Sequence, residues 1–154
     1  MKGKTLVLVS LFAIFKMNCV GQINDFKDIL IHPIKNRTIL RADDGTHSER
    51  AFLGLIKDSA GNVVFYVAKE FYTVQAALVK HGHSRILFFN RDKKLTAAYY
   101  LDDPGELPYK LIRNSLYFKR TRDKEKLVQV VKVQTKLPVP LCVMPDDCYW
   151  PQEQ

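Results

Sequence analysis

Two histidines separated by one glycine, His81 and His83, are the first residues of this chain whose types and spacing suit chemistry. In an extended strand, residues two apart point to the same face, so both imidazole rings would face one metal ion or substrate. Gly82 between them instead favours a turn, in which the rings diverge. A further ligand would have to come from His32, His47 or an aspartate, which the sequence does not bring together. Two surface histidines are the favoured interpretation, and metal binding is the alternative.

The stretch from 41 to 50, RADDGTHSER, gathers polar side chains of the kinds used in catalysis and metal binding, namely Asp43, Asp44, His47, Ser48 and Glu49. Calcium loops place acidic oxygens at alternating positions and close on a distant glutamate, whereas Asp43 and Asp44 are adjacent. His47 and Ser48 are also adjacent, so their side chains do not face each other as a nucleophile and its base do. We expect a solvated connector. A small secreted hydrolase or metalloprotein that combines this loop with the histidine pair is the alternative.

The segment from 119 to 126, KRTRDKEK, is basic and follows the aromatic residues Tyr117 and Phe118. Basic residues near aromatic ones are typical of polyanion and nucleic-acid contacts. Asp123 and Glu125 dilute the charge, and charged turns also protect sheet edges from aggregation. We favour a charged hairpin tip, with polyanion binding as the alternative. Its contact residues would be Lys119, Arg120, Arg122, Lys124 and Lys126.

The sequence contains no phosphate-binding glycine loop, HExxH helix or nucleophile elbow. No coherent set of nucleophile, base and oxyanion donors can be assembled from it, so we predict no catalytic residue, no metal and no cofactor. The favoured function is a small non-catalytic binding or structural module. Its ligand is unknown, and a protein or a polyanion would be its partner.

The N-terminus predicts the compartment. Lysines precede an uncharged apolar run at 5–15, TLVLVSLFAIF, and small residues follow at Cys19 and Gly21. This order is that of a secretory signal peptide, and the run is shorter than the roughly 20 residues that cross a bilayer. We expect cleavage after Gly21 rather than a lipid anchor on Cys19, because no small residue stands just before that cysteine. The mature protein would be periplasmic or extracellular.

Export also decides how the remaining cysteines are interpreted. Loss of 1–21 as a signal peptide leaves Cys142 and Cys148 in a mature chain of 22–154, with no second hydrophobic segment. An even number of cysteines in an exported chain favours a disulfide, and no further cysteine completes a usual zinc site. We therefore predict a single β-rich domain at 22–154 whose Pro-rich C-terminal tail is closed by a Cys142–Cys148 disulfide. The whole chain is basic, with a formal net charge of +8.

Clusters of turn-forming residues punctuate the rest of the chain at short intervals. They are 57–62, 90–94, 102–108 and 119–126. β-rich runs between such clusters are typical of antiparallel hairpins, since parallel strands need longer crossovers. We predict a mainly antiparallel β fold, a meander of about six to seven strands in a sandwich or a partly closed barrel. Within 102–108, adjacent proline and glycine favour a type II turn.

Two segments depart from this rhythm. Residues 23–33 space apolar side chains at helical intervals between Asn24 and Pro33, which predicts a short N-terminal helix. Residues 72–82 fit a strand or a helix. The surrounding hairpins favour a strand that turns at Gly82, and the alternative is an α+β fold with a helix at 72–81.

The central strands are apolar on both faces. VVFYV at 63–67 and ILFF at 86–89 lack the apolar–polar alternation of a sheet with one solvated face. Both faces must therefore be covered by the N-terminal helix, by the tail from 137 to 151, or by a partner, and we favour the chain itself. Because consecutive strand residues point to opposite faces, we expect all four aromatic residues to be substantially buried, namely Phe65, Tyr66, Phe88 and Phe89.

Overall fold

The computed structural model describes residues 26–43, 46–76, 78–122 and 125–152. These residues form short helices and eleven strands. In chain order the elements are α1 (Lys27–Leu30), β1 (Thr38–Asp43), β2 (Thr46–Lys57), β3 (Val63–Ala76), β4 (Val79–Phe89), β5 (Leu95–Leu101), the 3-10 helix η1 (Pro104–Glu106), β6 (Lys110–Ile112), β7 (Ser115–Arg122), β8 (Glu125–Lys132), β9 (Leu141–Met144), β10 (Asp147–Tyr149) and β11 (Pro151–Gln152).

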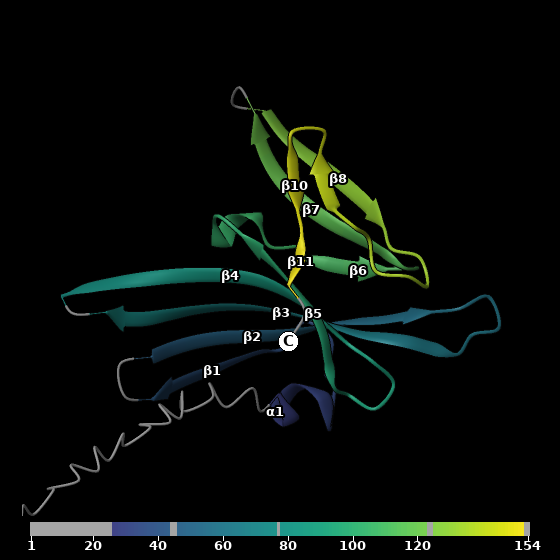
Figure 1. Ribbon diagram of the computed structural model, residues 1–154, viewed down its shortest axis with the longest axis horizontal. Coiled ribbons are helices and arrows are strands. Elements are labelled where there is room, and N and C mark those ends of the chain that lie inside the picture. Colours follow the sequence, from purple (N-terminus) through teal and green to yellow (C-terminus); the bar gives the residue numbers. More distant parts are fainter. Residues whose placement is uncertain (1–25, 44–45, 77, 123–124, 153–154) are drawn as a thin grey trace, which may run out of the picture.

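The strands form two main layers and a hairpin. The large sheet has the order β1-β2-β3-β4-β5-β11, the small sheet has the order β6-β7-β8, and β9 pairs with β10. Figure 1 shows the small sheet and the β9–β10 hairpin on one side of the large sheet and α1 on the other. The predicted antiparallel β fold is confirmed, with sheets that do not close into a barrel. The strand number exceeds the prediction because strands as short as β6 and β11, with three and two residues, leave almost no alternating pattern in the sequence.

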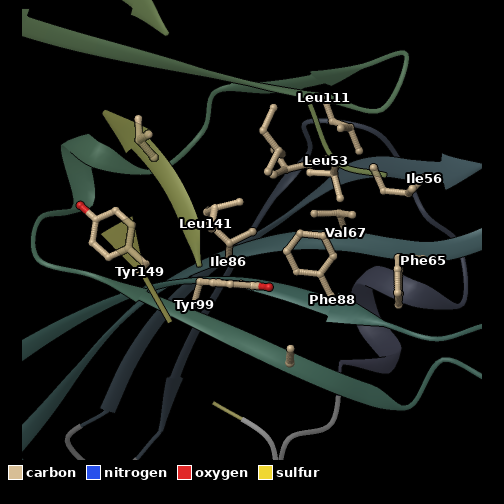
Figure 2. Packing of buried hydrophobic residues seen from close by; sticks show 14 of the residues in the cluster. Leu53, Ile56, Phe65, Val67, Ile86, Phe88, Tyr99, Leu111, Leu141 and Tyr149 are labelled. Carbon is tan, nitrogen blue, oxygen red and sulfur yellow. The ribbon is translucent and has the colours of Figure 1, made fainter. Parts of the chain in front are cut away.

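The first core fills the space between the two sheets. Phe88 packs edge-to-face against Phe65 and Tyr99, with ring centroids 5.9 and 5.5 Å apart. Figure 2 shows this group beneath Leu111 of the small sheet and beside Leu141 of the tail. The Tyr99 hydroxyl also donates a 2.6 Å hydrogen bond to the carbonyl oxygen of residue 138. This core therefore joins the large sheet, the small sheet and the tail.

The second core lies on the opposite face of the large sheet, beneath α1. Phe89 meets Phe26 edge-to-face at 5.1 Å, while Ile29 and Leu30 of α1 add further buried apolar surface. Phe88 and its chain neighbour Phe89 are 0% and 1% exposed. The predicted cover on both faces is confirmed, and the chain itself supplies it. Phe65 is also buried and Tyr66 is half-buried.

The segment at 72–82 is extended, as favoured, but the predicted turn at Gly82 is wrong. β3 runs to Ala76, β4 begins at Val79, and Gly82 lies inside β4 opposite Thr73. A Cβ at this glycine would lie 3.0 Å from the ring of Phe71 on the neighbouring strand. Gly82 therefore serves the close approach of an aromatic ring across the hairpin rather than a change of chain direction.

Two local predictions need correction and one is confirmed. The helix expected at 23–33 spans only Lys27–Leu30, and Asn24 lies outside the described residues. The expected type II turn is instead the 3-10 helix Pro104–Glu106, because Asp103 and the glutamate of this helix form a reciprocal capping box.

The tail disulfide is present, with the sulfurs of Cys142 and Cys148 2.04 Å apart. The predicted signal peptide lies outside the described residues.

Candidate functional site

The histidine pair lies on an extended strand. His81 and His83 both belong to β4, opposite Val74 and Tyr72, so the two rings share one face of the large sheet. His83 stacks on Tyr72 with ring centroids 5.0 Å apart. The divergent turn expected around Gly82 is therefore wrong, and the pair takes the same-face geometry of a strand.

His47 and Glu49 do not join this pair. His47 lies opposite Thr73, whose side chain points away from the face that carries Tyr72 and Val74. His47 Nε2 lies 3.7 Å from the carboxylate of Glu49. The Asp43 side chain and all of Asp44 lie outside what the structure describes. Among the described residues, no three His, Cys, Asp or Glu side chains gather as a metal site requires.

A buried ion cluster that the sequence did not predict lies beside the second core. The expectation of a solvated connector at 41–50 is wrong at Ser48 and Arg50, because both lie in β2 with buried side chains. The Glu70 carboxylate accepts hydrogen bonds from Arg50 Nε at 2.7 Å, Arg85 Nε at 2.6 Å and Ser48 Oγ at 3.0 Å. Ser48 and Arg50 come from β2, Glu70 from β3 and Arg85 from β4. The sequence signal was the set of polar residues at positions that share a face with buried apolar ones, such as Glu70 two residues after Ala68.

The paired charges of this cluster indicate that it stabilises the fold. Burial favours the neutral form of Arg85, but the Glu70 carboxylate outweighs this effect and raises the pKa of the guanidinium. Burial also raises the pKa of the adjacent Tyr72. The Arg50 guanidinium lies 4.4 Å from the ring centre of Phe26, just before α1, so the cluster ties α1 to the large sheet. Glu70 is 1% exposed, which keeps substrates away from its carboxylate.

A hollow between α1 and β1 is too small for a substrate. Its walls include Asp28, His32, Arg37 and Phe52, and it holds about 20 Å³. A single water molecule needs about 10–15 Å³ by the same measure. The hollow therefore has room for about one water molecule, and a substrate could not enter it to reach His32.

The outer face of the small sheet, turned away from the large sheet, has a different character. Leu111, Leu116 and Phe118 point inward to the first core, so the residues alternating with them point outward. This outer face consists of ten register positions, namely Lys110, Ile112, Ser115, Tyr117, Lys119, Thr121, Lys126, Val128, Val130 and Lys132. They include four lysines and no acid. The outer face is therefore strongly positive.

Tyrosine rings organise two of these lysines. The ring of Tyr117 meets the ring of Tyr109, which precedes β6, at 6.4 Å. Lys110 Nζ lies 5.2 Å from the centre of the Tyr109 ring, and Lys119 Nζ lies 4.9 Å from the same centre. Lys110 Nζ is also 4.5 Å from the centre of the Tyr117 ring. Attraction of ammonium groups to aromatic faces therefore places both lysine charges near the Tyr109 ring.

The basic residues predicted from 119 to 126 divide between the two faces of β7 and β8. Lys119 and Lys126 lie on the outer face. Arg120 points inward, where it pairs with Glu106 at 2.7 Å and with Asp147 at 2.6 Å. Burial opposes the charge of Arg120, but its hydrogen-bond and acidic partners prevail and raise its pKa. The Arg122 side chain and Lys124 lie outside the described parts of the chain.

The inward arginine and the missed lysines have sequence signals. Arg120 alternates with Phe118, so it belongs to the buried face of the same strand. The missed lysines are Lys110 and Lys132. Lys132 lies on an outward position of β8, and Lys110 lies opposite Tyr117 in the β6–β7 pair. The alternation of residues along 126–132 could have identified Lys132, whereas β6 has only three residues and leaves almost no pattern around Lys110.

Comparisons with known proteins give no guide to function. No family model, curated protein or solved structure matches the chain. Within the described residues, no helix is long and apolar enough to span a membrane.

Proposed function

We propose that this protein is a non-catalytic binding module that binds polyanions on the outer face of the small sheet. The observation that carries the proposal is the charge of that face, with four lysines and no acid among its ten positions. Lysine ammonium groups offer hydrogen-bond donors and positive charge to phosphate, sulfate and carboxylate groups. Polyanion binding was the alternative interpretation of 119–126 in the sequence. We now propose it for the outer face of the small sheet instead of for that turn.

The arrangement of the lysines supports anion binding energetically. Lys110 and Lys119 approach one tyrosine ring, so an anion that binds near this ring is attracted by both ammonium groups. The ring contacts also restrict both side chains before binding, which lowers the entropy lost on association.

The alternative of a hydrolase or metalloprotein has less support from the same structure. His47 lies on the opposite face of the large sheet from His81 and His83. The most polar buried group, Glu70, is held by two arginines away from solvent. A binding role needs no such convergence of groups.

Export remains part of the proposal. Disulfides persist in oxidising compartments, so the Cys142–Cys148 bridge is compatible with a periplasmic or extracellular protein. Polyanions such as sulfated or phosphorylated polymers and anionic lipids are also found outside the cytoplasm, where the outer face would meet them.

The test compares two triple variants with equal loss of charge. One replaces Lys119, Lys126 and Lys132 of the outer face with Gln. The control replaces three exposed lysines associated with α1 and the large sheet, namely Lys27, Lys80 and Lys94, with Gln. We expect fluorescently labelled heparin to bind the wild type and the control similarly and the outer-face variant at least tenfold more weakly. Equal weakening by both triples would show that only net charge matters and would contradict the proposal.

A further inference from the structure

The outer face of the small sheet also exposes apolar side chains, which simple charge recognition does not require. Val128 and Val130 of β8 are 55% and 51% exposed, and Ile112 of β6 is 40% exposed. Val128 lies directly opposite Lys119, and Val130 lies directly opposite Tyr117. Apolar and cationic groups therefore interleave on the same surface instead of forming separate patches.

This combination distinguishes between kinds of polyanion. A sulfated polysaccharide or a polyphosphate offers charge and no apolar phase, so exposed valines gain nothing by meeting it. Single-stranded nucleic acid offers bases that stack on aromatic rings, but ammonium groups already occupy positions over Tyr109 and Tyr117. An anionic lipid surface offers both negative headgroups and an apolar layer just beneath them.

The tyrosines also fit a membrane interface. Tyrosine has an apolar ring and a polar hydroxyl, and it is enriched where one end of the side chain is in apolar surroundings and the other is wet. Tyr109 and Tyr117 are half-buried at the level of the lysines. Lysine stems are themselves apolar and can lie along such a surface while the ammonium groups reach the headgroups.

Resting on the proposed function, we infer that the polyanion bound by the outer face is the surface of an anionic lipid bilayer. Lys119, Lys126 and Lys132 contact the headgroups, and Val128 and Val130 enter the layer below them. The small sheet would lie flat on the membrane, with the large sheet turned away from it (Figure 1).

The experiment measures co-sedimentation of the mature protein with vesicles, using pure phosphatidylcholine and a mixture that contains phosphatidylglycerol. Every variant begins at residue 22, where we propose that the mature chain begins, so the apolar run at 5–15 does not contribute to vesicle binding. Wild type should bind the anionic vesicles more strongly than the neutral ones. The Lys→Gln triple variant of the outer face should bind the anionic vesicles roughly a hundredfold more weakly, since each lysine near such a surface contributes about fivefold.

The double variant Val128→Thr with Val130→Thr isolates the apolar contribution, because threonine keeps the β-branched shape and adds a hydroxyl. We expect its binding to anionic vesicles to fall roughly tenfold, while its heparin binding stays within about twofold of wild type. The matched control changes two other exposed valines, Val79 and Val139, to Thr and should leave both kinds of binding unchanged.

Each other outcome has a distinct meaning. Heparin binding without a preference for anionic vesicles would overturn the membrane inference and leave the proposed function standing. Equal loss of heparin and vesicle binding in the valine variant, or tighter binding of a single-stranded oligonucleotide than of vesicles at equal phosphate concentration, would also overturn it. Absence of binding to heparin and to anionic vesicles alike would overturn the proposed function.

Discussion

The buried Glu70 cluster makes the sharpest prediction about stability. Glu70→Gln keeps the size of the side chain and removes the single negative charge that Arg50 and Arg85 share at 2.7 and 2.6 Å. The side chains of these arginines are only 10% and 3% exposed. The two guanidinium charges would then stay buried without the negative charge of Glu70. The amide nitrogen of Gln would also offer a hydrogen-bond donor where the arginines need an acceptor.

Breaking a buried ion pair in this way typically costs about 3–5 kcal/mol. A domain of this size has a total stability of about 5–15 kcal/mol, so the Glu70→Gln variant would lose a large share of it. We expect urea unfolding at pH 7 and fixed salt to show this decrease in the free energy of unfolding. The measurement should use tyrosine fluorescence and circular dichroism together, because agreement of the two probes supports a two-state analysis.

Glu49→Gln is the matched control. Glu49 lies on the neighbouring strand, and its side chain is 50% exposed beside His47. We expect a change within about 0.5 kcal/mol, since exposed ion pairs contribute little. A Glu70→Gln variant that also changed stability by less than about 1 kcal/mol would refute the reasoning, because it would mean that the two arginines are solvated or compensated without Glu70.

Three further predictions concern the core, the pH dependence and the tail. Phe88→Ala should lower the free energy of unfolding by about 3–5 kcal/mol in urea titrations, because Phe88 is fully buried against two aromatic rings; a cost below 1 kcal/mol would contradict this packing. Burial raises the pKa of Tyr99 from 10.0 to about 12. Above pH 10 the unfolded chain therefore releases this proton before the folded one, and stability should fall up to pH 12 by at most about 1.4 kcal/mol per pH unit from this group. Tyr99→Phe should show a shallower fall, and an unchanged slope would be inconsistent with the shift. Thiol labelling of the unfolded, unreduced protein should find neither Cys142 nor Cys148 free, and reduction should cost about 2 kcal/mol because the closed loop is short; two labelled thiols would exclude the bridge.

The sequence was most informative where side-chain period and turn chemistry agree. The apolar runs around Phe65 and Phe88 required cover on both faces, and the structure supplies α1 on one face and the small sheet with the tail on the other. The cysteine count likewise predicted the tail disulfide. These features follow from local rules about alternation and pairing, which act within a few residues.

Features that depend on cross-strand neighbours were harder to predict. Glycine is common in turns, but Gly82 lies inside a strand, where the ring of Phe71 on the adjacent strand leaves little room for a Cβ. Glu70 is apparent as a cluster residue only when the β2–β3–β4 register brings Arg50 and Arg85 beside it. Lys110 is similar, since its place on the outer face depends on pairing with β7. Register sets such contacts, and a single sequence does not determine it over strands of this length.

The outer face of the small sheet is the proposed binding site, and a residue-by-residue binding map would locate the site in solution. We would titrate isotope-labelled protein with a short heparin-derived oligosaccharide and follow the backbone amide signals by NMR. We expect shifts concentrated in β6, β7 and β8 around Lys110, Lys119 and Lys132, and we expect these shifts to become smaller as salt rises. Shifts centred instead on the face that carries His81 and His83, or spread evenly over exposed lysines such as Lys80 and Lys94, would contradict it.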